Sequence, residues 1–241
     1  MKTILMLCLF GVVLCSSNFA QAVDWQVVYQ TDFSSDPGWA TNSPDNMYWA
    51  SGSQSFHIKS WDGGNQSVYV PIPVQPILSC KLEYDIKVTH LDWAGDARFG
   101  LGDPDMDVFQ PSTWYADYWN GDRGNSAILE YHSESSQGRL GDNYAFLFEQ
   151  NTVYHNIITY DSPTQTLIWQ ALFEGTVMFE GQRTGVGTFV GMDRLYSSSI
   201  GDDYAPGAMG EAYIDNVVFS VPEPATLLLL GLGGLFLRKR K

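Results

Sequence analysis

The chain has few basic residues, little charge of either sign and only three cysteines among its 241 residues. Charged residues make up 17% of the chain and aromatic residues 14%, a composition that argues against intrinsic disorder. Lys and Arg number 13 against 27 Asp and Glu. A nucleic-acid-binding protein needs clustered basic residues to neutralise phosphates, so we expect no nucleic-acid partner.

Cysteine and histidine are too sparse to build a disulfide framework or a metal centre. Cys8 and Cys15 lie in the first 22 residues, which leaves Cys80 without an internal partner, and we expect it to be a small buried hydrophobe. The four histidines (His57, His90, His132 and His155) are scattered, with no His-Glu-x-x-His pattern. No Gly-x-Ser-x-Gly or phosphate-loop motif is present either.

The N-terminus has the pattern of a secretory signal peptide. Lys2 precedes an 11-residue apolar stretch, Ile4–Leu14, which is short against the roughly 20 residues of a membrane span. Ala20 and Ala22 form an A-x-A cleavage site, so residues 1–22 are predicted to form a signal helix that signal peptidase removes. A lipoprotein signal would use Cys15, but Leu14 stands where such signals prefer a small residue.

The C-terminus combines three features in a fixed order. Pro222-Glu223-Pro224 is followed by an apolar stretch of 13 residues at 225–237, and Arg238, Lys239, Arg240 and Lys241 end the chain. Two prolines in three residues break regular structure, so they separate the preceding domain from a short apolar helix. A terminal basic cluster is expected to stay in the cytoplasm, which places the domain outside the inner membrane.

Together these features resemble the PEP-CTERM sorting signal over residues 221–241. The resemblance implies a bacterial protein that an exosortase-type sorting protease handles. The tail would hold the protein transiently in the inner membrane, and the domain would then reach the cell surface or extracellular matrix, among extracellular polysaccharide. An ordinary C-terminal anchor, or an amphipathic end packed on the domain, is the alternative. The predicted organisation is therefore a signal peptide at residues 1–22, a domain at 23–220 and a sorting tail at 221–241.

The part between the ends is strongly acidic, with eight basic and 26 acidic residues from Val23 to Val221. Such a charge favours solubility and repels anionic polymers, whereas it suits divalent cations.

The central part has the patterns of β-strands. Residues 80–88 alternate apolar with charged side chains, and 153–160 with 166–173 form a predicted hairpin. No stretch of ten residues before the tail has a sustained helical period. The sequence predicts an all-β, two-sheet antiparallel β-sandwich. Further strands are expected at 25–33, 48–51, 55–59, 67–72, 98–101, 127–132, 144–149, 187–192 and 211–219.

Short fragments at both ends of this region are similar to jelly-roll domains of the concanavalin A-like and laminin-G-like kind. They are Thr31-Asp32-Phe33 with Gly38-Trp39, the hairpin at 157–168, and Ala212-Tyr213-Ile214-Asp215-Asn216-Val217. The resemblance implies that the first and last strands pair in one sheet. Galactose-binding-like jelly rolls of carbohydrate-binding modules share these fragments, so both architectures remain open.

The sequence lacks the carboxylate pattern of a sandwich glycosidase. Glycosidases need two carboxylates roughly 5–10 Å apart, and no Glu-x-Asp-x-x-Glu strand occurs here. Glu83 and Asp85 alternate with Lys81 and Lys87, which is typical of a solvated outer face. We therefore expect no enzyme, and a polysaccharide hydrolase or lyase is the least favoured hypothesis.

Two groups of acidic residues suggest a structural Ca²⁺. Asp103, Asp105 and Asp107 have the spacing of a calcium loop, but Val108 and Trp114 stand where an EF-hand needs Gly and Glu. The jelly-roll resemblance suggests a second site at Asp32 and Asp215. The alternative for Asp215 is a hydrogen bond to a nearby turn.

Trp114, Tyr115, Tyr118 and Trp119 form the densest aromatic stretch, and Asn-Gly-Asp follows them. Because these aromatics are adjacent in pairs, we expect a loop rather than a strand. Exposed Trp and Tyr rings offer flat faces on which sugars stack, so the stretch is a candidate glycan platform. The alternative is a loop whose rings cover the core. The sequence favours an exported binding or structural protein, with a lectin-like module as the second hypothesis.

Overall fold

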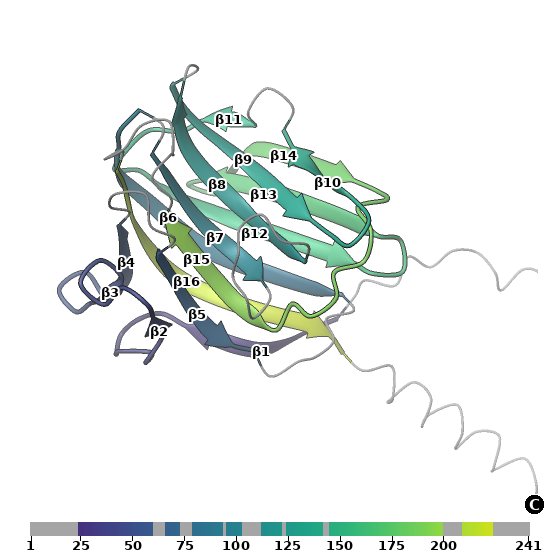
Figure 1. Cartoon of the computed structure of the whole chain (residues 1–241), viewed down its shortest axis with the longest axis horizontal. Helices are drawn as coiled ribbons and strands as arrows, with labels where there is room; N and C mark the ends of the chain where they lie inside the picture. Colours follow the sequence, from purple (N-terminus) through teal and green to yellow (C-terminus); the bar gives the residue numbers. More distant parts are fainter. Residues whose placement is uncertain are drawn as a thin grey trace, which may run out of the picture. The chain divides into compact units, whose positions relative to one another are not determined.

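Two antiparallel sheets stack face to face in the computed structural model, which describes residues 24–59, 66–72, 79–93, 95–102, 112–121, 124–141, 145–199 and 209–223 (Figure 1). Strands of sheet A follow the order β14-β13-β12-β6-β16-β4-β3, and β1 also pairs with β16. Strands of sheet B follow the order β10-β9-β8-β7-β15-β5-β2, and β11 pairs with β9. The predicted all-β sandwich is confirmed.

The strands in these ranges have the following bounds: β1 Trp25–Thr31, β2 Ala40–Thr41, β3 Tyr48–Ala50, β4 Ser55–Lys59, β5 Gln66–Pro71, β6 Cys80–Leu91, β7 Asp96–Gly102, β8 Thr113–Gly121, β9 Gly124–His132, β10 Gln137–Leu140, β11 Phe146–Leu147, β12 Val153–Asp161, β13 Thr166–Phe173, β14 Thr176–Arg183, β15 Arg194–Ser199 and β16 Gly210–Pro222. Residues 1–23, which include the predicted signal peptide, and the tail from residue 224 lie outside the described residues. Within the described part, no helix is long and apolar enough to cross a membrane.

The first and last strands pair as the jelly-roll resemblance implies. β1 runs antiparallel to β16 from Trp25↔Pro222 to Thr31↔Val217. The hairpin β12–β13 is also as predicted, with Asp161 opposite Thr166 at its turn. Both ends of the sandwich domain are therefore held in the middle of sheet A, next to β6 and β4.

The alternating pattern of β6 separates a core face from a solvent face. Cys80, Leu82, Tyr84, Ile86 and Val88 are buried, while the residues between them are half-buried on the other side. Cys80 is the small buried hydrophobe that its place at the head of a strand predicts, and burial raises the pKa of its thiol.

Several segments differ from the sequence prediction. Strands β10, β14 and β15 were not expected, and of the predicted strand at 144–149 the described part forms only Phe146–Leu147. Residues 187–192 were expected to form a strand, but they form none, because Gly187 and Gly191 have φ of 85° and 82°. At Gly187 a Cβ would lie only 2.5 Å from the Ser133 hydroxyl oxygen, so this glycine also allows a close approach. β8, by contrast, is a nine-residue strand where a loop was expected.

A buried cluster of hydrogen-bonded side chains links the two sheets through the core. Asn156 of β12 accepts hydrogen bonds at Oδ1 from the Tyr118 hydroxyl of β8 (2.7 Å) and from the Trp169 indole Nε1 of β13 (3.1 Å). All three side chains are fully buried. A buried amide oxygen that serves two donors costs little, whereas its loss would leave both donors without a partner.

We expect Asn156→Ala to lower the free energy of unfolding by about 2–6 kcal/mol, since two buried donors lose their acceptor. Tyr118→Phe, which removes only one of these hydrogen bonds, should cost about 1 kcal/mol. Urea unfolding followed by Trp fluorescence measures both variants. A negligible loss in Tyr118→Phe would show that this hydrogen bond between the sheets does not contribute to stability.

Candidate functional site

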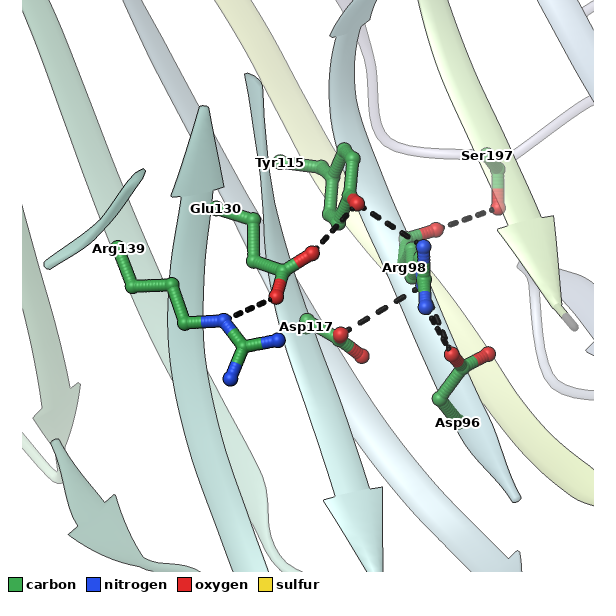
Figure 2. A network of polar contacts seen from close by, with 7 residues as sticks. All are labelled: Asp96, Arg98, Tyr115, Asp117, Glu130, Arg139 and Ser197. Atoms are coloured by element: carbon green, nitrogen blue, oxygen red, sulfur yellow. Dashed lines mark hydrogen bonds and ion pairs between the residues drawn. The ribbon is translucent and has the colours of Figure 1, made fainter. Parts of the chain in front are cut away.

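A network of charged and polar side chains covers the face of sheet B that points away from the core (Figure 2). On β7, Ala97, Phe99 and Leu101 enter the core, so Asp96 and Arg98 project on the opposite face. The same two-residue period separates the core residues of β8 and β9 from Tyr115, Asp117 and Glu130. Strand register then aligns Arg98 with Asp117, and Tyr115 with Glu130.

Arg98 is the centre of this network. Its Nε lies 2.8 Å from Oδ2 of Asp96 and 3.6 Å from Oδ2 of Asp117. Its Nη1 donates to the Tyr115 hydroxyl at 2.9 Å, and the guanidinium carbon lies 4.9 Å from the Tyr115 ring centroid. The backbone carbonyl of Arg98 accepts from Ser197 Oγ of β15 at 3.0 Å, so the contacts of Arg98 join β7, β8 and β15 (Figure 2).

Glu130 extends the network toward the edge of the sheet. The Tyr115 hydroxyl accepts from Arg98 and donates to Oε2 of Glu130 at 2.7 Å. Arg139 of β10 pairs with Oε1 of the same carboxylate at 2.5 Å. Both oxygens of Glu130 are therefore engaged by neighbouring side chains, and its position is fixed from two directions.

Burial controls the protonation of these groups. Exposed fractions of the Arg98 and Asp117 side chains are only 12% and 5%. Burial raises the pKa of Asp117 well above its usual range, against the opposing effect of Arg98. Burial also disfavours the charge of Arg98, but Asp117 and Asp96 outweigh it and raise the Arg98 pKa. Among the described residues, no group hydrogen-bonds to Oδ1 of Asp117.

These contacts limit what the network can do chemically. A glycosidase uses a protonated and an ionised carboxyl on either side of the scissile bond. Here Asp96 and Asp117 are held by one guanidinium, and Glu130 is held by Tyr115 and Arg139. The network therefore fixes the register of β7, β8 and β9, and its carboxylates already have partners.

The aromatic stretch forms strand β8, so the predicted loop is wrong, and the exposed glycan platform that depended on it is wrong as well. Trp114 and Tyr118 are fully buried in the core, where no sugar ring can stack on them. Tyr115 is buried in the network of Arg98, and Trp119 is half-buried near the end of β8. Adjacent aromatics in a strand simply face opposite sides of the sheet.

The proposed calcium residues are placed only in part. Asp103, Asp105 and Asp107 lie outside the described residues. Asp32 accepts from the Ser34 amide at 3.0 Å, which is the main reason that its pKa is lowered. Asp215 accepts from the Asn216 amide at 2.7 Å, as the turn alternative expects, and burial raises its pKa. In the described ranges no three His, Cys, Asp or Glu side chains form a metal-binding group, and the calcium sites stay a prediction.

Glu83 and Asp85 lie on the outer face of sheet A, as their alternation with lysines predicts. His155 of β12 lies between them, with Nδ1 2.7 Å from Asp85 and Nε2 3.8 Å from Glu83. Hydrogen bonds to Asp85 and Glu83 raise the His155 pKa to about 9, and the hydrogen bond from His155 is the main reason that the Glu83 pKa falls to about 2. An ion triplet therefore ties β12 to β6 at neutral pH.

The sequence carries a local signal for the network on sheet B. Arg98, Asp117 and Glu130 each stand two residues from another polar side chain or from Tyr115, within runs whose intervening residues are apolar. Period-two alternation identifies these strands separately. Only strand pairing brings the three side chains together, since they are up to 32 positions apart in the chain.

The fold belongs to the class of jelly-roll β-sandwiches, and solved structures similar to it include carbohydrate-binding and glycosidase-type domains. The CBM2 module of the evolved Dit of Lactobacillus casei BL23 phage J-1 matches with a TM-score of 0.56 and 14% identity, over 84% of this chain and 98% of that one. The Emp47p carbohydrate recognition domain matches with a TM-score of 0.55 and 13% identity, over 84% and 98%.

A glycosyl hydrolase family protein from Mycobacterium fortuitum is similar to the same extent, with a TM-score of 0.56 and 12% identity over 80% of this chain and 99% of that one. A sialidase also matches, with a TM-score of 0.55 and 13% identity over 81% of this chain, but the match covers only 18% of the sialidase. At such identities these likenesses show the fold alone.

The C-terminus matches the PEP-CTERM protein-sorting motif over residues 220–241, which confirms the resemblance seen in the sequence. The motif indicates export and sorting at the membrane by an exosortase. No curated protein matches the chain.

Arg98→Met should lower the free energy of unfolding by about 3–5 kcal/mol, because it leaves buried carboxylates without their counter-charge. Arg183→Met is the matched control. Arg183 is exposed and donates to the Arg139 carbonyl at 3.3 Å, so its loss should change stability by less than about 0.5 kcal/mol. Guanidinium unfolding of both variants measures the difference, and similar values would contradict a structural role for the network.

The stability of the protein should fall as pH rises from 6.5 to 9 through the titration of His155. Its pKa is higher in the folded chain than the usual 6.5, so its stabilisation is complete below pH 6.5 and is lost as pH passes about 9. Glu83, with a pKa of about 2, stays ionised throughout. Melting temperatures of wild type and His155→Gln across this range should converge toward high pH; parallel curves would disprove the coupling.

Proposed function

We propose that this chain is an exported bacterial surface protein whose β-sandwich binds extracellular polysaccharide without cleaving it. The observation that carries the proposal is the PEP-CTERM motif at residues 220–241, directly after a jelly-roll domain. Signal peptidase would remove residues 1–22, the sandwich would comprise 23–220, and 221–241 would be the sorting tail. After transient anchoring in the inner membrane, the domain would remain at the surface or in the extracellular matrix.

Two observations support binding rather than catalysis. Similar folds include a CBM2 module and a carbohydrate recognition domain. The carboxylates of sheet B are buried and bonded to Arg98, Tyr115 and Arg139, so on that face no acid and base lie free on either side of an open site. The high acidic charge favours a neutral polysaccharide over an anionic one.

A polysaccharide hydrolase is the second candidate, because a glycosyl hydrolase family protein has a similar fold. The raised pKa of Asp117 and the ion-paired Glu130 would supply an acid and a carboxylate on one face. Their burial and their existing partners are the reasons that it ranks second.

One experiment distinguishes the two functions. The full-length chain is incubated with insoluble β-glucan, cellulose and galactomannan, and both sedimentation with the polymer and release of reducing ends are measured. We expect co-sedimentation without new reducing ends. Release that Glu130→Gln abolishes would establish the hydrolase instead, whereas neither binding nor release on any polymer would remove the carbohydrate proposal.

A further inference from the structure

The outer face of sheet A has a groove that runs across the strands. One hollow of about 590 Å³ is lined by Ser53, Ser55, Asp85, Lys87, Thr89, Val153, Tyr213 and Asp215. A second, of about 560 Å³, begins at the same Asp85 and Val153 and continues over β12 and β13 to the turn at Glu174 and Gly175. Both volumes lie in the range of sites for small organic ligands, roughly 300–1,000 Å³.

Strand register explains the direction of the groove. One row of facing residues joins Asp215, Asp85, His155 and Leu172 across four neighbouring strands. The adjacent row joins Tyr213, Lys87 and Val153. From β4 to β13 there are four strand spacings of about 4.8 Å, so the groove spans roughly 19 Å. This length suits several units of a linear polymer better than one small molecule.

A β-bulge in β16 lies beside the groove and holds one of its carboxylates in place. The register between β16 and β6 shifts between Asp215 and Val218, and Asn216 has a φ of 50°. Asp215 and Asn216 consecutively avoid the core, and burial resumes at Val217. The side-chain amide nitrogen of Asn216 (Nδ2) donates to Asp85 Oδ2 at 2.8 Å, which fixes that carboxylate where the two hollows meet.

Several groups in the groove keep unused hydrogen-bonding capacity. Among the described residues, the Tyr213 hydroxyl, the Lys87 ammonium and Oδ2 of Asp215 have no hydrogen-bond or ion-pair partner. Asp85 is held by His155 and Asn216 but retains lone pairs on its two oxygens. These donors and acceptors match sugar hydroxyl groups, which both donate and accept.

An aromatic row continues from one end of the groove. Tyr48, His57 and Tyr213 face one another across β3, β4 and β16, with ring centroids 4.7 and 5.0 Å apart. Tyr48 is 43% exposed and Tyr213 half-buried. Their faces can carry the apolar side of a sugar ring. Lys87 and protonated His155 oppose the charges of Asp85 and Asp215, and Glu174 at the far end gives the lining one net negative charge, which disfavours an anionic polymer.

From this geometry we infer that the groove on sheet A binds a linear neutral polysaccharide, with Tyr213 as the stacking ring and Lys87, Asp85 and Asp215 as hydroxyl partners. The inference rests on the proposed carbohydrate-binding function and assigns it a site. That site lies on the sheet opposite the Arg98 network, and none of its residues belongs to that network.

The test measures dissociation constants of the full-length chain for soluble β-glucan, galactomannan and dextran, with the anionic polymer alginate as a contrast. Tyr213→Ala should weaken binding of the preferred neutral polymer at least about tenfold, while Tyr213→Phe, which keeps the ring, should lose less. Lys87→Met and Asp215→Asn leave the core intact and should each weaken binding about threefold or more. Gln170→Ala and Glu180→Ala, a hydrogen-bonded pair on the same face outside the groove, are the matched controls.

The outcomes separate the inference from the proposed function. Neutral-glycan binding that persists unchanged in Tyr213→Ala, Lys87→Met and Asp215→Asn would overturn the groove while leaving carbohydrate binding in place. Preference for alginate would overturn the neutral ligand class. No binding by the wild type to any polymer would remove the proposed function and the groove with it. Melting temperatures show which variants are folded. If Tyr213→Ala does not fold, the affinity of Lys87→Met tests the groove instead.

Discussion

The pairing of β16 with three other strands is the constraint on which the rest of the sandwich depends. Its first half pairs with β4 and its second half with β1, while β6 pairs along its other edge. Segments from both ends of the domain are thereby fixed in one sheet. A single slip of register would turn every core residue of β16 toward solvent, so its buried face specifies the register strongly. At the bulge, Asp215 and Asn216 both point away from the core, so the inward alternation of β16 is interrupted there and resumes at Val217.

The two outer faces of the sandwich have different characters. On sheet B, charged groups are buried together and bond to one another around Arg98, which makes that face a rigid support. On sheet A, the polar groups near Asp85 are only half-buried, and several keep capacity for a ligand. Buried ion pairs are costly to break, whereas exposed donors and acceptors can exchange water for sugar at little cost.

Prediction from sequence succeeded where a strand has one wet face. β6 was predicted closely because its apolar residues alternate with charged ones, and the hairpin β12–β13 because turn residues join two runs of β-branched and aromatic residues. It failed for β8, where aromatic and polar residues are buried on both faces and alternation of hydrophobicity disappears. It failed again at residues 187–192, where apolar residues suggested a strand but glycines adopt positive φ.

The sequence by itself determined the sorting motif, the all-β class and the inward face of the regular strands. These properties depend on local order along the chain: an apolar stretch between Pro-Glu-Pro and a basic end, or a period of two. Only the tertiary structure decided which polar residues meet. Arg98, Asp117 and Glu130 join through the pairing of three strands, and Asp85, His155 and Asp215 through that of three others. Register between distant strands is set by packing of the whole core, and no short stretch of sequence contains it.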